Sequence, residues 1–120
     1  MEFKWGKRIM NDIINDVNEL KENILKSSEY LNFKKSEKNL DNNKEVNKII
    51  TDIKKLQQKI IKKEDKNLDA EIEKIELESL YKELETYNDY IEYKKNARIF
   101  NDLITNIQKN FEEYFNSFLI

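Results

Sequence analysis

The sequence lacks histidine, cysteine and proline entirely and has a single glycine, Gly6. Without histidine, the side chain that most often moves protons near neutral pH is missing. Without cysteine there is no thiolate nucleophile, no disulfide and no thiolate ligand for zinc or an iron–sulfur cluster. One glycine cannot build the glycine-rich loops that hold nucleotide phosphates. These absences disfavour an enzyme, and we expect no catalytic residue, no cofactor and no bound metal.

The charge is nearly balanced, with 22 basic and 24 acidic residues and a net charge of −2. Such a balance gives no strong overall attraction to nucleic acids or anionic membranes. No apolar run approaches the ~20 residues that cross a bilayer. The first residues, Met-Glu-Phe-Lys-Trp, are too polar for the apolar centre of a signal peptide. We therefore expect a cytoplasmic protein that neither enters a membrane nor binds nucleic acid directly.

The C-terminal quarter of the chain carries the most regular apolar pattern. Its apolar residues recur at alternating spacings of three and four, which is typical of one helix face: Tyr90, Tyr93, Ala97, Phe100, Ile104, Ile107, Phe111, Tyr114 and Phe118. The pattern predicts a helix over residues 89–119 that spans about 46 Å at ~1.5 Å per residue. A compact domain of this chain length has a diameter of roughly 35 Å. Either the protein is elongated, or a second chain covers the part of the apolar stripe that extends beyond a compact domain.

Helical periodicity also covers the preceding residues, whereas strand alternation does not occur. A first helix is predicted over about residues 10–26, with a stripe made of Ile9, Ile13, Val17, Leu20 and Ile24. Ser27 and Ser28 are expected to cap a short second helix, because serine oxygens accept from free backbone N–H groups. The apolar residues of that helix are Tyr30, Phe33 and Leu40.

Three further signals divide the middle of the chain. Asn42 with Glu45 three residues later predicts a capping box. It opens a third helix whose stripe is Val46, Ile49, Ile53, Leu56 and Ile60. Residues 62–69 are charged or polar except Leu68, and they predict a turn or a solvated continuation. A fourth helix is expected from Ile72, Ile75, Leu80 and Leu84. Asn88, in the polar break 86–89, is the expected N-cap of the last helix.

These elements predict one all-α domain over residues 10–120, preceded by an extension over residues 1–9. About five helices are expected, dominated by a long antiparallel hairpin in which Phe100 and Ile104 face the stripe of the third helix. Only 38% of the residues are hydrophobic, and an open hairpin buries less surface than a globule. We therefore expect a homo-oligomer, or a complex with another protein.

Two charged clusters invite functional interpretations. Lysines gather on the third helix and just beyond it, where they could contact RNA phosphates: Lys55, Lys59, Lys62, Lys63 and Lys66. Glu64 and Asp65 lie among them and no aromatic residue is interleaved, so a solvated face is favoured. Four carboxylates suggest a cation site: Glu71, Glu73, Glu76 and Glu78. Their spacing scatters them around the helix, which favours ordinary helix surface.

Aromatic residues at the two ends of the chain could bind partners. The segment from Phe3 to Arg8 is either a basic and aromatic arm or a frayed extension, and the second interpretation is favoured. Near the C-terminus, four aromatic residues are hard to cover within one chain; we call them the distal aromatic cluster: Phe111, Tyr114, Phe115 and Phe118. We predict that they form a partner or oligomer interface, with membership of the core as the alternative.

Three segments together resemble the YlbF/YmcA family. Residues 24–37 (ILKSSEYLNFKKSE) look like its short second helix. The next helix matches at Val46, Ile49, Ile50, Ile53, Lys54, Leu56 and Gln57. The following turn and the start of the last helix match at Leu84, Tyr87, Ile91, Glu92, Tyr93 and residues 101–104. The resemblance runs from about Asp12 to Tyr114 and is closer to the YmcA type. Asn88 stands where many members have proline, a harmless exchange at a helix start.

The resemblance implies a small cytosolic helical protein of Gram-positive bacteria and their relatives. Members are non-enzymatic regulators of competence, sporulation and biofilm formation. The YmcA and YlbF types act in a complex with a YaaT-type protein, and that complex is linked to RNase Y-dependent mRNA maturation. Iron–sulfur clusters are associated with the complex, but this chain has no cysteine to ligate one. No catalytic residue can be carried over from the family.

The sequence thus predicts a helical adaptor that works through protein–protein contacts. A purely structural coiled-coil module is one alternative, and an RNA-binding helical hairpin is another. The breaks at Ser27 and Ser28, near Asn42 and near Asn88 favour the adaptor over a continuous rod.

Overall fold

The computed structural model describes the backbone of residues 2–119 and the side chains of residues 6–119. Over these residues the chain forms five α-helices and no strand: α1 (Glu2–Lys26), α2 (Ser28–Asn42), α3 (Lys44–Asp65), α4 (Glu71–Leu84) and α5 (Asn88–Phe118). The predicted all-α class with about five helices is confirmed. Helix α1 begins well before residue 10, because no proline interrupts this segment and a single glycine costs a helix only about 1 kcal/mol. The side chains of Phe3, Lys4 and Trp5, expected in a terminal arm, lie outside those described.

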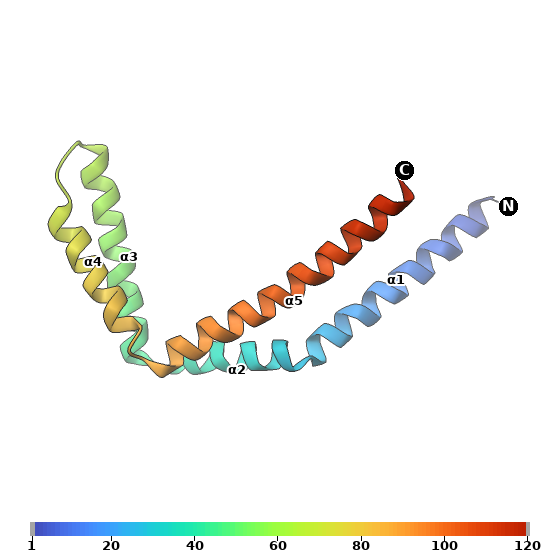
Figure 1. The fold of residues 1–120 in the computed structure, drawn as a ribbon, viewed down its shortest axis with the longest axis horizontal. Coiled ribbons are helices and arrows are strands. Elements are labelled where there is room, and N and C mark those ends of the chain that lie inside the picture. Colours follow the sequence, from blue (N-terminus) through green and yellow to red (C-terminus); the bar gives the residue numbers. More distant parts are fainter. Residues whose placement is uncertain (1, 120) are drawn as a thin grey trace.

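The helices form two arms that meet at an elbow (Figure 1). One arm is the hairpin of α3 and α4, and the other contains α1 and α2 on one side and α5 on the other. The described residues extend over 70 × 36 × 23 Å with a radius of gyration of 22.3 Å. A compact domain of this length would have a radius of about 14 Å. The protein is therefore elongated, as the length of the last helix predicts.

Two side-chain caps fix where the helices change direction. The Ser27 hydroxyl oxygen accepts from the backbone N–H of Tyr30 at 3.2 Å and begins α2. The Asn43 side-chain oxygen accepts from the backbone N–H of Val46 at 3.1 Å and begins α3. The predicted capping box at Asn42 is thus wrong by one residue. Asn88 is likewise the first residue of α5 and not its N-cap, which is Tyr87 without a side-chain hydrogen bond.

The principal core lies at the elbow. It joins the end of α2, the first half of α3 and the end of α4, through Leu40, Val46, Ile49, Ile53 and Leu84. Tyrosines at the start of α5 pack against this cluster, among them Tyr87, Tyr90 and Tyr93. Burial here raises the pKa of the Tyr87 hydroxyl, and the nearby charge of Glu45 adds to the effect. The Asn43 amide also donates to the Asp89 carboxylate at 3.0 Å, which ties the start of α3 to the start of α5.

The long last helix packs along α2, not along α3. Phe100 lies against Tyr30 and Phe33 of α2, with ring centroids 5.4 Å apart in both pairs. The prediction that Phe100 and Ile104 face the third helix is therefore wrong. Helix α3 buries its stripe against α4, because the short turn after Asp65 folds α4 straight back along it. Asn67 makes this turn possible by adopting a φ of 57°, which asparagine tolerates better than most residues.

Helix α4 turns only half of its predicted stripe inward: Leu80 and Leu84 pack in the core as predicted, but Ile72 and Ile75 do not. Ile72 and Ile75 are 79% and 66% exposed, whereas the inward residues are Glu73, Leu77, Leu80 and Leu84. Glu73 is almost fully covered, and its burial is tolerated because the Lys63 ammonium of α3 donates a hydrogen bond to its carboxylate. This bond holds the pKa of Glu73 below its ordinary value of 4.5. The apolar pattern alone gave no sign that a carboxylate occupies this face.

Candidate interaction surface

The distal aromatic cluster lies on the last turns of α5, beyond the reach of α2 (Figure 1). Its members are 44% (Phe111), 66% (Tyr114), 61% (Phe115) and 70% (Phe118) exposed. The same stripe is half-buried nearer the elbow, for example at Tyr93 and Phe100. The four residues are therefore not part of the core of this chain.

The cluster forms two adjacent rows along α5. Phe111 and Phe115 stack with ring centroids 6.2 Å apart, and Tyr114 and Phe118 meet edge to face at 5.4 Å. Residues four apart in a helix lie on the same side, so each row follows the helix axis. The ring pairs hold one another in place while their outer faces remain open to solvent.

An open groove separates this part of α5 from α1. It has a volume of about 660 Å³ and is lined by Ile13, Asp16, Val17, Leu20, Ile107, Asn110, Phe111, Tyr114, Phe115 and Phe118. We call it the distal groove. It forms because α1 bends away from the line of α2 at Ser27 and packs on α2 only near that junction. All four residues of the distal aromatic cluster thus lie in one surface feature.

The opposite wall of the groove is part of the apolar stripe predicted for the first helix, and the pattern did not indicate that this stripe is exposed. Ile13 and Val17 are 51% and 53% exposed, although they belong to an unbroken apolar stripe. Met10 and Ile14 form a second exposed apolar row next to it. The sequence did contain a signal. Where two regular apolar stripes have no further helix to cover both of them, part of the apolar surface is expected to stay exposed.

The groove carries little charge. Asp16 is the one charged residue among the side chains that line it, and Asn110 is its one amide. Large apolar side chains with few charges are typical of the buried centre of protein–protein interfaces. Exposed apolar patches of this kind mark sites where another surface binds. The chemistry of the groove therefore suits an apolar surface better than a nucleic acid or a polar metabolite.

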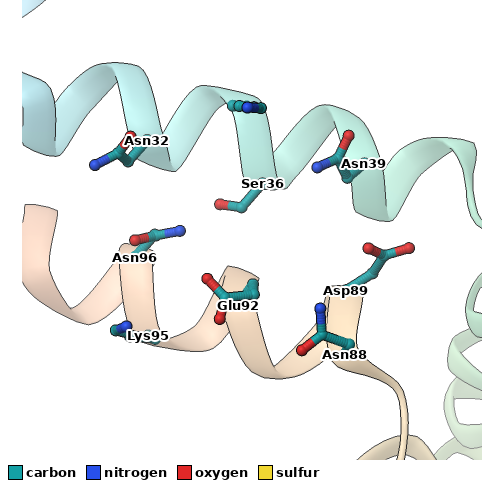
Figure 2. A pocket seen from close by; sticks show the side chains of 9 residues that line it. Asn32, Ser36, Asn39, Asn88, Asp89, Glu92, Lys95 and Asn96 are labelled. Atoms are coloured by element: carbon teal, nitrogen blue, oxygen red, sulfur yellow. The ribbon is translucent and has the colours of Figure 1, made fainter.

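A second cleft, entirely polar, runs between α2 and the start of α5. Its volume is about 410 Å³, and its lining is Asn32, Lys35, Ser36, Asn39, Asn88, Asp89, Glu92, Lys95 and Asn96. Figure 2 shows the Ser36 side chain directed across the cleft toward α5. The Ser36 hydroxyl donates to the backbone oxygen of Phe33 at 2.9 Å, so its proton is already used. The sequence did not predict this cleft, because its polar residues come from two helices that only the fold brings together.

The lysines of α3 are partly engaged in ion pairs. Lys63 is bound to Glu73, and Glu64 binds Lys74 of α4 at 3.0 Å. Oppositely charged neighbours reduce the positive potential that an RNA backbone would need. The carboxylates from Glu71 to Glu78 do not converge, and no described group of three or more acidic side chains could hold a metal ion. The other lysines and Glu71, Glu76 and Glu78 lie on the helix surface, as interpreted, and Lys63 is half-buried. Glu73 is buried, so the interpretation as ordinary helix surface is wrong for this residue.

None of the described helices combines the length and apolar character required to cross a membrane.

The fold and its surface define an elongated all-α protein with an uncovered apolar groove at the end of one arm. The chain belongs to the YlbF/YmcA family, because the family model for control of the competence regulator ComK, YlbF/YmcA, matches residues 13–114. The match covers most of the chain and includes the elbow, the polar cleft and most of the distal groove. The resemblance seen in the sequence is thereby confirmed, and the family is a regulatory one. A comparison with curated proteins finds no match.

Proposed function

We propose that this protein is a non-enzymatic cytoplasmic adaptor in the control of competence and that it acts through protein contacts at the distal groove. The observation that carries the proposal is the exposure of the distal aromatic cluster opposite the apolar wall of α1. Leaving this much apolar surface in water is unfavourable by about 25 cal/mol per Å². A bound protein surface would remove that cost.

Membership of the family supports a regulatory function, and the complexes that other members form suggest which process this protein regulates. By that analogy the protein acts with YlbF-type and YaaT-type proteins in a complex linked to RNase Y-dependent mRNA maturation. The side chains of both clefts support a binding role over catalysis. The distal groove is apolar, and the polar cleft offers amides, lysines and carboxylates without a histidine or cysteine.

Complementation of a gene deletion in the host would test this proposal. The deletion strain would receive the natural gene, a groove variant with Phe115→Ser and Phe118→Ser, or a control with Ile72→Ser and Ile75→Ser. The control removes two isoleucines of similar exposure from the other arm. We expect the natural gene and the control to restore transformation frequency and the groove variant to fail.

Equal restoration by all three genes would contradict a role for the groove. A deletion strain that remains fully competent would contradict the regulatory role itself. Western blots of the three proteins would establish that they accumulate to similar levels.

A further inference from the structure

We infer that the exposed side of α3 is a second docking surface, which binds an acidic helix of another protein. The surface is a row of lysines that we call the lysine stripe, and its members are Lys44, Lys48, Lys55, Lys59 and Lys62. It lies on the α3–α4 hairpin, away from the distal groove, so the inference goes beyond the proposed function and does not rest on it. It depends on the alignment of the lysines, on their positive charge and on the straight course of the helix.

The lysines of the stripe recur along almost the whole of α3. Their spacings are four, seven, four and three residues, and Thr51 takes the position that would divide the gap of seven. With ~3.6 residues per turn, the five positions fall within a strip roughly 60° wide and about 27 Å long. All five lysines are exposed. Away from the elbow, α4 is the described helix that packs along α3, so the other side of α3 stays open (Figure 1).

The ion pairs between described residues leave the charge of the stripe uncompensated. They engage Lys63 and Lys74 at the far end of the hairpin, and Lys34 and Lys82 elsewhere, but no lysine of the stripe. Like charges three or four residues apart repel one another along a helix. A positive charge in the first turn, as at Lys44, also opposes the helix dipole. An anionic partner would relieve both kinds of repulsion.

A straight partner fits this surface best. An acidic α-helix laid along α3 has the same repeat, so carboxylates three and four residues apart can face the lysines over the whole stripe. The strands of an RNA duplex wind around their axis, so a straight row of lysines would meet phosphates only where a strand crosses it. Single-stranded RNA is commonly held by aromatic side chains on which its bases stack, and the stripe contains none. These observations favour an acidic helix over a nucleic acid.

The chemistry of lysine sets the character of the complex. Lysine ammonium groups are strongly hydrated point charges on flexible stems. Charge pairs at an exposed surface steer association and select the partner more than they hold it tightly. Salt screens them over a distance of ~8 Å at physiological ionic strength. We therefore expect a reversible complex whose dissociation constant rises as salt is added.

Fluorescence anisotropy with the purified full chain and a labelled synthetic peptide tests the inference. The peptide consists of alanine and glutamate, has the length of α3, and carries its glutamates three and four residues apart along one side. We expect binding at low salt that weakens toward about 150 mM salt. Lys48→Glu with Lys55→Glu and Lys62→Glu should raise the dissociation constant about tenfold or more, because the three lysines lie along the middle of the stripe.

Two controls separate the stripe from other causes. Lys21→Glu with Lys38→Glu and Lys109→Glu makes the same change in net charge at exposed lysines of α1, α2 and α5. This variant should keep the dissociation constant within about twofold of the natural value, since isolated surface charges contribute little. The groove variant, Phe115→Ser with Phe118→Ser, should bind the peptide as the natural protein does.

The opposite results would overturn the inference. A natural protein that does not bind the peptide, or equal weakening by both sets of lysine substitutions, would show that the stripe is ordinary solvated surface. Tighter binding of poly(U) or of an RNA duplex than of the peptide, lost with the stripe substitutions, would assign the stripe to a nucleic acid. Loss of peptide binding in the groove variant alone would place the peptide in the distal groove.

Circular dichroism of each variant establishes that the helices are retained. If charge reversal unfolds the chain, glutamine at the same three positions of the stripe provides the test, with an expected rise of about threefold or more in the dissociation constant. Failure of the peptide to bind leaves the proposed function standing, because complementation by the groove variant tests a different surface.

Discussion

The elbow and the distal arm use the same sequence pattern with opposite outcomes. Val46 and Leu84 at the elbow are 0% and 3% exposed, whereas Ile13 and Phe118 at the end of the arm are 51% and 70% exposed. All four belong to apolar stripes with helical spacing. At the elbow, the end of α2, the first half of α3, the end of α4 and the start of α5 converge. The comparison teaches that a stripe identifies the face of a helix that prefers an apolar partner, but not whether this chain provides one.

The two regions differ in charge as well as in burial. The far end of the α3–α4 hairpin is closed by the ion pairs of Lys63 with Glu73 and of Lys74 with Glu64. Its small apolar layer, Ile60 and Ala70, is buried beside them. The distal groove has neither ion pairs nor cover among the residues that line it. The face between α3 and α4 is therefore covered within this chain, although Ile72 and Ile75 on the outer side of α4 stay exposed, whereas the facing walls of the distal groove are left open.

The largest contrast should come from the same truncation in the two regions. Ile53→Ala at the elbow should lower the free energy of unfolding by about 2–5 kcal/mol, because it opens a cavity in the core. This is a large part of a typical stability of about 5–15 kcal/mol. Ile13→Ala on the arm should cost the monomer less than about 1 kcal/mol. Urea unfolding of both variants at a concentration where the chain is monomeric checks the difference, and equal losses would show that the arm is packed in solution.

A smaller loss of stability is expected from a truncation where the two regions join. Phe100→Ala removes a half-buried ring that packs on Tyr30 and Phe33 of α2. We expect a loss of about 2–3 kcal/mol, below the ~3–5 kcal/mol of a fully buried phenylalanine. A double-mutant cycle of Phe100→Ala with Phe33→Ala should show coupling, since the rings are in contact. Additive losses would argue against the pairing of α5 with α2.

Little change in monomer stability is expected from Phe115→Ser with Phe118→Ser. Both side chains are mostly exposed, so helical circular dichroism and the melting of the monomer should be retained. Partner capture or self-association should be lost instead. If this variant unfolds as readily as Phe100→Ala, the distal aromatic cluster belongs to the core and the interface assignment fails.

The smallest effect should be the dependence of the protein's stability on pH that arises from the α3–α4 hairpin. The Lys63 hydrogen bond lowers the pKa of Glu73 below 4.5, its value in the unfolded chain. The stabilisation is therefore complete above pH 4.5 and is lost as the pH falls through the lower folded pKa. Thermal unfolding from neutral pH to pH 3, compared with Glu73→Gln, measures this contribution. We expect a flatter acid dependence for Glu73→Gln, and identical curves would show that the pair contributes nothing.

Much of the fold could be predicted from local signals. Apolar spacing located all five helices, and the serine pair placed the start of α2, because periodicity and caps act within a few residues. The bounds were less exact, with both asparagine caps displaced by one residue and α1 starting earlier than expected. On α4 the prediction was right for Leu80 and Leu84 and wrong for Ile72 and Ile75. The pattern favoured the isoleucines because nothing local shows that Lys63 binds Glu73 and allows it to be buried.

The candidate site was predictable only in part. The distal aromatic cluster was identified from the length of α5, because a helix longer than a compact domain must project beyond it. The wall supplied by α1 was not identified, since its stripe equally suits burial in a core. The polar cleft was missed because none of its residues forms a pattern within a single helix.

By itself the sequence determined the all-α class, the length of the last helix, the family and the lack of the residues that most active sites require. These properties depend on composition and on contacts between residues a few positions apart. Only the tertiary structure decided that α5 packs on α2, that α3 pairs with α4, and that α1 bends away to leave a groove. Several helices with similar apolar faces can pair in more than one way. The turns at Ser27, Asn43, Asn67 and Tyr87 bring particular faces together, and those turns select one pairing from the set that the pattern allows.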